Sequence, residues 1–265
     1  MQENKNNDQN IPKDHPRYYS LKYRHQIIEG MRNLVVAEAG LIAHGRGECF
    51  DYILGEKTSE TAYNATKAAI AALLLAKNPI ISVNGNVAAL VPEELVTLSE
   101  ILNVPLEINL FYRKKGRVEA ITNVLESSGA KILFGKNESK MVEINELSSN
   151  RRRIDPNGIK KSDVVMVPLE DGDRTEALKK IGKKIITIDL NPISRTALNA
   201  DITIVDNIIR TIPLMIKIAK ELKNSKEENL REILNNFSNK KNIGKTLDLI
   251  IDYIKKEKNE LLNKA

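Results

Sequence analysis

Apolar side chains recur at helical spacing in several stretches of the chain, and these stretches alternate with short continuous apolar runs. Spacing of three and four residues predicts a helix, and a short unbroken run predicts a buried strand. Helices are predicted over residues 21–39, 60–76, 92–102, 117–127, 175–181, 213–222 and 247–262, and strands over 80–83, 106–111, 131–134, 163–169, 184–190 and 202–205. The alternation predicts an α/β fold: a Rossmann-like, mostly parallel sheet flanked by helices, with extra N- and C-terminal helices.

Two stretches lack this periodicity. Residues 1–15 begin Asn-rich and polar, without the apolar stretch of a signal peptide, so we expect a disordered lead-in before a single α/β domain over 16–265. Residues 136–161 are predicted to form a long polar loop, in which Arg151 begins a solvated run of three arginines. Alternatively, this basic run attracts an anionic substrate. Ser20 is the expected N-cap of the first helix.

Composition narrows the class of protein. Lys and Arg number 41 against 35 Asp and Glu, a balance that nucleic-acid-binding proteins share. The lysines, however, alternate with glutamates, and aromatic residues make up only 4%, which leaves few surfaces for bases to stack on. No apolar run approaches the roughly 18 residues that span a bilayer, and the single cysteine excludes an internal disulfide. We therefore expect a cytoplasmic protein that binds neither nucleic acid nor membrane.

Polar side chains follow five of the predicted strands, where a parallel sheet binds its ligands. They are Asn84 and Asn86, Asn109 and Arg113, Asp171 and Asp173, Asp189 with Asn191, Ser194 and Arg195, and finally Asn207. Turn formation explains any one of these residues taken alone. Their recurrence at successive strand ends instead predicts a binding site along one edge of the sheet.

The residue types at the last two strand ends suit a nucleotide. Asp189 is placed to accept hydrogen bonds from ribose hydroxyls. Ser194 is suited to cap a short helix whose free N–H groups face a phosphate, and Arg195 adds a planar fork for phosphate oxygens. Asn207 offers both a donor and an acceptor to a base edge.

Two other places carry candidate chemistry. Asp171 and Asp173 flank a glycine and are suited to hold Mg²⁺ through oxygen ligands, although Asp173 as a simple helix cap explains the same pattern. Arg46 lies between two glycines in residues 43–48, which predicts a loop that brings the arginine close to a ligand; a solvated arginine is the alternative. The chain has no G-x-G-x-x-G or G-x-S-x-G motif, so neither a standard dinucleotide site nor a serine nucleophile is expected.

Four segments resemble the archaeal phosphopantothenate synthetases, also called 4-phosphopantoate–β-alanine ligases. They cover residues 41–48, 82–92, 167–178 and the pair 189–192 with 201–207, and the resemblance runs from about residue 16 to about residue 250. It implies an enzyme of coenzyme A biosynthesis that uses ATP and Mg²⁺ to join 4-phosphopantoate to β-alanine through an acyl adenylate. It also implies a homodimer.

The resemblance places the ATP contacts on specific positions. They are Arg24, Arg46, Asp189, Leu190, Asn191, Arg195, Thr196, Asn207 and Ile208. The catalytic and substrate-binding candidates, chosen for their place at strand ends or near glycines, are His44, Asn84, Asn86, Asn109, Arg113, Asp171 and Asp173. No metal ligand is assigned. A different adenylate-forming ligase, or a non-enzymatic nucleotide- or nucleic-acid-binding module, remains an alternative.

Overall fold

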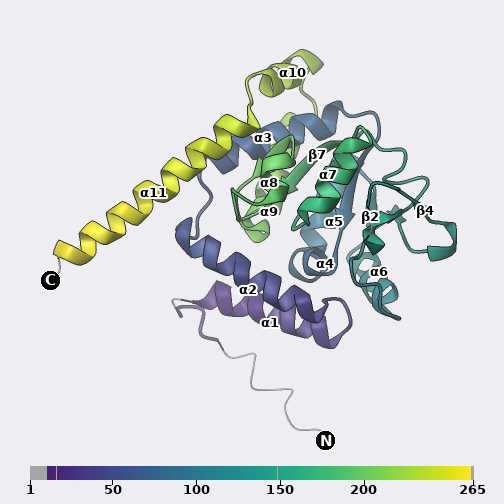
Figure 1. Cartoon of the computed structure of the whole chain (residues 1–265), viewed down its shortest axis with the longest axis horizontal. Helices are drawn as coiled ribbons and strands as arrows, with labels where there is room; N and C mark the ends of the chain where they lie inside the picture. Colours follow the sequence, from purple (N-terminus) through teal and green to yellow (C-terminus); the bar gives the residue numbers. More distant parts are fainter. Residues whose placement is uncertain (1–10, 16, 148, 264–265) are drawn as a thin grey trace, which may run out of the picture.

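The computed structural model describes residues 11–15, 17–147 and 149–263, and its centre is a six-stranded sheet (Figure 1). The strands are β1 (Pro79–Val83), β2 (Leu106–Ile108), β3 (Leu133–Phe134), β6 (Val164–Met166), β7 (Lys184–Ile188) and β8 (Ile202–Ile204). Every strand in this sheet pairs parallel with its neighbours, in the order β3-β2-β1-β6-β7-β8. The predicted α/β fold with a mostly parallel sheet is confirmed.

The strand order has a reversal point at its middle. The first half of the sheet grows outward from β1 through β2 to β3, and the second half grows the other way from β6 through β7 to β8. β1 and β6 pair directly, with Ile80 opposite Val165. Because the connections leave β1 and β6 in opposite directions, a crevice forms beyond their carboxyl ends, and such crevices bind ligands in open α/β sheets.

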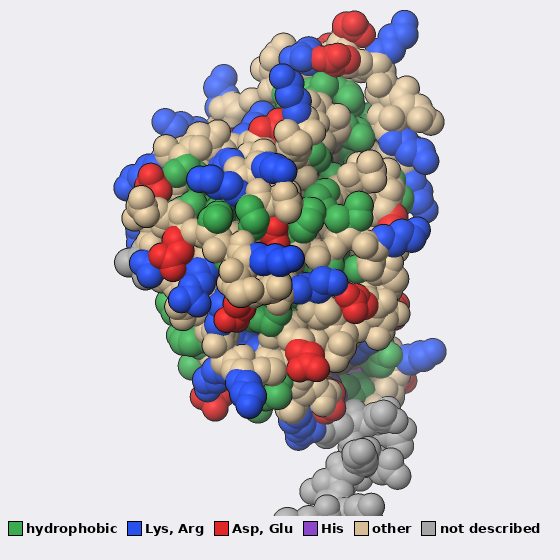
Figure 2. Space-filling model, turned by 90° about the vertical axis from the view of Figure 1, so that its right-hand side faces the viewer, with side chains coloured by type: hydrophobic (Ala, Val, Ile, Leu, Met, Phe, Trp, Pro, Cys, Tyr) green, Lys and Arg blue, Asp and Glu red, His purple; other side chains and the backbone are tan. Residues whose placement is uncertain are grey.

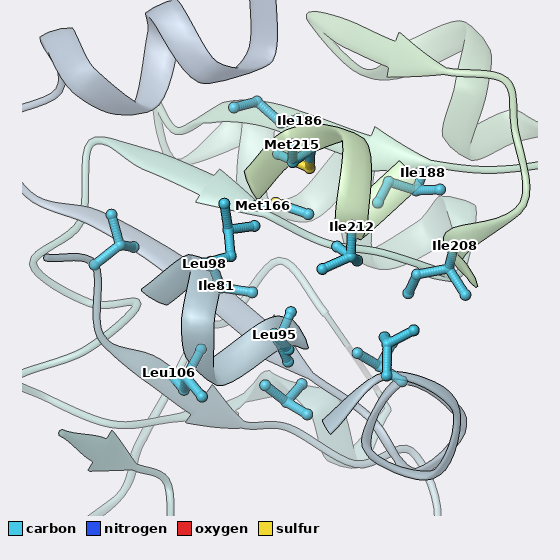
Figure 3. Close-up of a cluster of buried hydrophobic side chains, with 14 of the residues drawn as sticks. Ile81, Leu95, Leu98, Leu106, Met166, Ile186, Ile188, Ile208, Ile212 and Met215 are labelled. Atoms are coloured by element: carbon cyan, nitrogen blue, oxygen red, sulfur yellow. The ribbon is translucent and has the colours of Figure 1, made fainter. Parts of the chain in front are cut away.

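Helices cover both faces of the sheet. The larger hydrophobic cluster contains residues of α3 (Glu60–Leu75), α4 (Gly85–Leu90), α5 (Pro92–Leu102), α6 (Arg117–Ser127) and α9 (Ile208–Leu222). The smaller cluster on the other face contains residues of α7 (Gly172–Lys180). Side chains alternate between the two clusters, as period-two strands require: Ile80 and Val165 join the smaller one, and Ile81 and Met166 the larger (Figure 3).

The N-terminal part differs from its prediction. Instead of one helix over 21–39, the chain forms α1 (Tyr18–Arg32) and α2 (Glu38–Ile53), separated by a turn in which Leu34 adopts φ 63°. The expected N-cap is wrong, because Ser20 lies inside α1 and donates a hydrogen bond to Glu48 at 2.6 Å. The loop expected at 43–48 is also wrong. These residues lie within α2, where two glycines are tolerated although each costs about 1 kcal/mol relative to alanine.

Residues 136–161 are more ordered than the predicted polar loop. They contain the short antiparallel pair β4 (Val142–Glu143) and β5 (Arg153–Ile154), together with the 3₁₀ turns η1 (Glu138–Lys140) and η2 (Asn150–Arg152). Apolar side chains spaced through the segment enter the smaller cluster, among them Ile144, Leu147, Ile154 and Ile159. The spacing of these side chains is irregular, so neither helical nor strand periodicity reveals them.

The C-terminal part also holds more helix than predicted. α9 begins at Ile208 and continues through Pro213, where the prediction placed its start. α10 (Glu227–Asn235) has no counterpart in the prediction, and α11 (Asn239–Asn263) begins well before residue 247. Figure 1 shows α11 projecting away from the sheet towards the C-terminus. None of the helices in the described ranges is both long and apolar enough to cross a lipid bilayer.

Candidate active site

A pocket of about 290 Å³ lies beyond the carboxyl ends of the strands, under helix α2. It takes lining residues from the ends of β1, β2, β6, β7 and β8 and is therefore centred on the reversal point of the sheet. The polar and charged lining residues are His44, Arg46, Glu48, Asn84, Asn86, Tyr112, Arg117, Arg151, Asp171 and Asn207, and the apolar ones include Leu110, Phe111, Leu169, Leu190 and Ile208. We call this cavity the strand-end pocket.

Asn84 joins the two central strands at the floor of the pocket. Its side-chain Oδ1 accepts a hydrogen bond from the backbone N–H of Val87 at 3.1 Å, which caps α4. Its Nδ2 donates to the carbonyl oxygens of Pro168 and Leu169, both at 3.1 Å. Because the amide uses both ends, it fixes the spacing of the β1 and β6 ends around the reversal point.

Asn86 holds helix α2 against this floor. Its Nδ2 donates to the carbonyl oxygen of Gly40 at 2.8 Å. A Cβ added at Gly40 would lie 2.3 Å from Asn86 Oδ1 and 2.7 Å from a methyl carbon of Val36, so only glycine permits this approach. Gly40 thus lets α2 descend onto α4 and form the roof of the pocket.

A half-buried histidine and a paired glutamate project from α2. Burial lowers the pKa of His44 and so favours its neutral imidazole, and its Nε2 has no hydrogen-bond partner among the described residues. Burial would raise the pKa of Glu48, but hydrogen bonds from Ser20 and Arg24 outweigh it and hold that pKa below its usual range. Arg24 and Glu48 form an ion pair at 2.8 Å, which connects α1 to α2 beside the pocket.

Asp189 forms a compact turn at the end of β7. Its carboxylate accepts hydrogen bonds from the backbone N–H of Asn191 at 2.9 Å and from the hydroxyl of Ser194. Burial raises the pKa of Asp189, whereas these hydrogen bonds and the nearby positive charge of Arg46 oppose the rise. The turn presents Leu190 to the pocket and leads into α8 (Arg195–Asn199), which Ser194 caps as predicted.

A second cluster of charges fastens α2 to the end of β8. Arg210 pairs with Asp51 of α2 at 2.5 Å and with Asp206 at 2.6 Å. Asp51 also accepts a hydrogen bond of 2.7 Å from the side-chain amide of Asn207, which lines the pocket. Asn207 Oδ1 accepts a 3.3 Å hydrogen bond from Ile209 N–H, so the amide is oriented at both ends.

Sequence reasoning missed two arginines in this pocket, Arg117 and Arg151. Both are buried, and both line the pocket near Phe111 and Tyr112. The prediction of a solvated Arg151 is wrong: it contacts Glu170 and Asp171 and lies 5.9 Å from the centre of the Phe111 ring. The run of three arginines was the one sequence signal for Arg151. Of its two interpretations, a solvated loop and an anion-attracting group, only the second pointed to a ligand.

The comparison with known proteins identifies the family. A model of the phosphopantothenate/pantothenate synthetase family matches residues 61–253. The chain belongs to this family. It is 55% identical over 246 residues to a 4-phosphopantoate–β-alanine ligase of Thermococcus onnurineus, with 92% of each chain covered. A ligase of the same name from Methanosarcina mazei is 48% identical over 245 residues, 92% of this chain and 96% of the relative.

Within this synthetase, the predicted ATP contacts fall into two groups. Arg46, Leu190, Asn207 and Ile208 line the strand-end pocket. Asp189 and Asn191 form the turn that presents Leu190, Arg24 pairs with Glu48, and the Thr196 hydroxyl donates to the Glu170 carbonyl at 2.8 Å. Arg195 is 67% exposed and pairs with Glu176 at 3.0 Å, so reaching an ATP phosphate would require it to leave this partner.

The substrate-binding candidates divide in the same way. His44, Asn84, Asn86 and Asp171 line the pocket, whereas Asn109, Arg113 and Asp173 do not. Asn109 is buried and donates to the carbonyl oxygen of Arg153 at 2.9 Å, which ties down the 136–161 segment. Arg113 pairs with Glu138 at 3.1 Å.

The carboxylates near the pocket do not form a preorganised metal cage. Asp171 accepts a hydrogen bond from Arg151 at 3.2 Å, and the described ranges hold no group of three or more His, Cys, Asp or Glu side chains that fits a metal ion. The expected Asp171–Asp173 pair therefore lacks a third protein ligand. Mg²⁺ characteristically needs only one or two carboxylates when phosphate oxygens complete its coordination.

Proposed function

We propose that this synthetase joins 4-phosphopantoate to β-alanine in an ATP-dependent reaction that yields 4′-phosphopantothenate, AMP and pyrophosphate, a step of coenzyme A biosynthesis. The relatives named for this ligation are 43–55% identical over 80–93% of the chain. The structural observation that carries the proposal is the strand-end pocket, because most of its polar lining is made of residues that the family resemblance or the strand-end pattern selects.

The chemistry proceeds in two displacements. A carboxylate oxygen of phosphopantoate attacks the α-phosphorus of ATP, the bond to the β,γ-phosphates breaks, and pyrophosphate leaves. The uncharged amine of β-alanine then attacks the carbonyl carbon of the adenylate, AMP leaves with the carboxylate oxygen, and the amine proton passes to solvent or a nearby base. Neither displacement requires a covalent bond to the protein, so catalysis rests on positioning and on charge stabilisation.

The pocket residues suit these two tasks. Arg46 on the β7 side supplies a guanidinium for phosphate oxygens. Asn207, whose amide Asp51 orients, has a second Nδ2 hydrogen that is suited to a nucleotide. His44 is the pocket's neutral imidazole and is suited to accept the amine proton.

Further features of this function are part of the same proposal. Mg²⁺ accompanies ATP as the counter-ion of its phosphates, which agrees with the lack of a three-ligand protein cage in the described residues. The enzyme acts in the cytoplasm as a homodimer. The outer half of α11 supports a partner contact because it exposes Ile254, Leu261 and Leu262 at 50–70%.

The test is a product analysis with purified protein, ATP, Mg²⁺, phosphopantoate and β-alanine, in which each component is omitted in turn. The proposal predicts AMP, pyrophosphate and the amide only in the complete mixture. ADP and phosphate in place of AMP would contradict the adenylate route, although the protein would still be an ATP-dependent ligase. ATP binding without any product would contradict the choice of substrates.

The alternatives predict different results. Another adenylate-forming ligase shares the nucleotide side of the pocket and would release AMP only with a different acid or amine. A nucleic-acid-binding module would bind with a steep salt dependence and release no AMP. Figure 2 shows acidic and basic side chains interspersed over one face of the molecule, an arrangement that does not favour binding to a polyanion there.

A further inference from the structure

Arg117 is a buried cation in the wall of the strand-end pocket. Its side chain leaves α6 and donates hydrogen bonds to three backbone carbonyls, those of Leu34, Val35 and Tyr112. It forms no ion pair with a carboxylate in the described part of the chain. The residue is 5% exposed, and it lines the pocket.

Neutral carbonyls satisfy only some of the guanidinium's capacity. Arginine has five N–H donors, and three carbonyl contacts leave two of them available. Burial lowers the pKa of Arg117, and no charged group opposes that shift. Because an uncompensated buried charge is costly, an anion in the adjoining cavity would be bound favourably.

Arg151 supplies a second cation at the same side of the pocket. It arrives from the 136–161 segment, contacts Glu170 and Asp171, and has a buried Nε donor that lacks a partner among the described residues. Glu170 is shared with Arg174, which is fully buried, so two arginines compete for one carboxylate. Burial and the charge of Arg174 lower the pKa of Arg151 to about 10.

Both arginines contact residues that follow β2, whereas the proposed nucleotide contacts lie at the ends of β7 and β8. Arg117 binds the carbonyl of Tyr112 and Arg151 stacks near Phe111, two consecutive residues that follow β2. Arg46, by contrast, lies near Asp189 at the end of β7. The pocket therefore has arginines beside the end of β2 and beside the end of β7, and Asn84 at the end of β1 lies between them.

We propose that Arg117 and Arg151 form the subsite for the phosphate of the phosphorylated acid substrate, and that they make the enzyme select a phosphorylated acid over its unphosphorylated form. This inference rests on the proposed function. It follows from the chemistry of the acid: its carboxylate must reach the α-phosphate of ATP on the Arg46 side. The phosphate at the other end of the same molecule then extends towards β2, where the two arginines lie.

The experiment compares kcat/KM for phosphopantoate and for pantoate, at saturating ATP and β-alanine, in wild-type protein and in R117K, R117M and R151M. R152M is the matched control, because Arg152 is a half-buried neighbour that pairs with Glu143 at 3.2 Å and does not line the pocket. ATP affinity in the absence of acid and the thermal midpoint are measured for every variant.

The inference predicts that kcat/KM for phosphopantoate falls roughly 10- to 100-fold in R117M and R151M, while that for pantoate changes by less than about threefold. R152M keeps the wild-type ratio. Equal losses with both acids, or an unchanged ratio, would overturn the inference. If R117M does not fold, R117K and R151M carry the same comparison. Wild-type protein that is inactive with both acids would instead overturn the proposed function.

Discussion

The carboxylate of Asp51 accepts a hydrogen bond of 2.7 Å from the side-chain amide of Asn207, across 156 positions of sequence. Asp51 lies near the end of α2, the helix that carries His44 and Arg46, and Asn207 lies just past β8. Arg210 reinforces the contact by pairing with Asp51 and with Asp206. The roof of the strand-end pocket is thus fastened to the strand that supplies a proposed nucleotide contact.

Replacement of Asp51 should weaken the contact between α2 and the residues that follow β8. In Asp51→Ala we expect the free energy of unfolding to fall by about 3 kcal/mol, because Arg210 loses one of two carboxylate partners in a mostly buried setting. The KM for ATP should rise roughly tenfold as Asn207 loses its orienting acceptor. Asp51→Asn is the control, since it keeps an acceptor for Asn207 while removing the charge. Urea unfolding and ATP titration measure both effects, and wild-type ATP affinity in Asp51→Ala would contradict this role.

Two glycines of α2 provide a matched pair. An added Cβ at Gly40 would collide with Asn86 and Val36, whereas one at Gly45 would meet nothing within 4 Å. Gly40→Ala should therefore destabilise the protein by about 1–3 kcal/mol and impair activity. Gly45→Ala should stabilise it by about 0.5–1 kcal/mol, because alanine is the better helix former. Thermal unfolding of both variants checks this, and destabilisation by Gly45→Ala would indicate the loop that the sequence suggested.

A buried carboxyl should give the protein a characteristic pH dependence. Glu107 of β2 is fully buried and accepts hydrogen bonds from the backbone N–H groups of Asp155 at 3.0 Å and Ile159 at 2.6 Å. Burial raises the pKa of Glu107 to about 7, although these two hydrogen bonds and the charge of Arg174 oppose the rise. Between about pH 5 and pH 7, Glu107 therefore keeps its proton in the folded state, although it has lost that proton in the unfolded state.

The sign of this effect follows from proton linkage. Because the native state binds the extra proton, the contribution of Glu107 to stability is full below about pH 5 and declines by roughly 2–3 kcal/mol as the pH rises towards 7. Glu107→Gln removes this contribution, so its stability deficit relative to wild type should be larger at pH 5 than at pH 8. Denaturant unfolding at the two pH values provides the measurement. A deficit that grows with pH would contradict the raised pKa.

The sheet and most of its covering helices could be predicted from the sequence, because their signals are local. The apolar run at 80–83 and the proline at the start of 92–102 both match the structure closely. The break between α1 and α2 was missed because apolar residues continue through it. Gly45 and Gly47 suggested a loop, although both lie inside α2, the helix that Asn86 contacts at Gly40.

The lining of the pocket was predictable where one residue type at a strand end sufficed, as for Asn84 and Asn207. The lining was not predictable where it depends on contacts between residues that are distant in sequence. Arg117 begins a helix and Arg151 lies in a polar stretch, and only the packing of distant carbonyls and carboxylates around them turns both side chains into the pocket. Asp51 is similar, since its partners are far away in sequence.

The most direct test of the account is the fate of a carboxylate oxygen. Phosphopantoate labelled with ¹⁸O in its carboxylate is converted with ATP, Mg²⁺ and β-alanine, and the products are examined by mass spectrometry. Attack of the carboxylate on the α-phosphorus predicts one labelled oxygen in AMP and none in pyrophosphate. Labelled phosphate alongside ADP, or AMP without the label, would contradict an adenylate formed in the strand-end pocket.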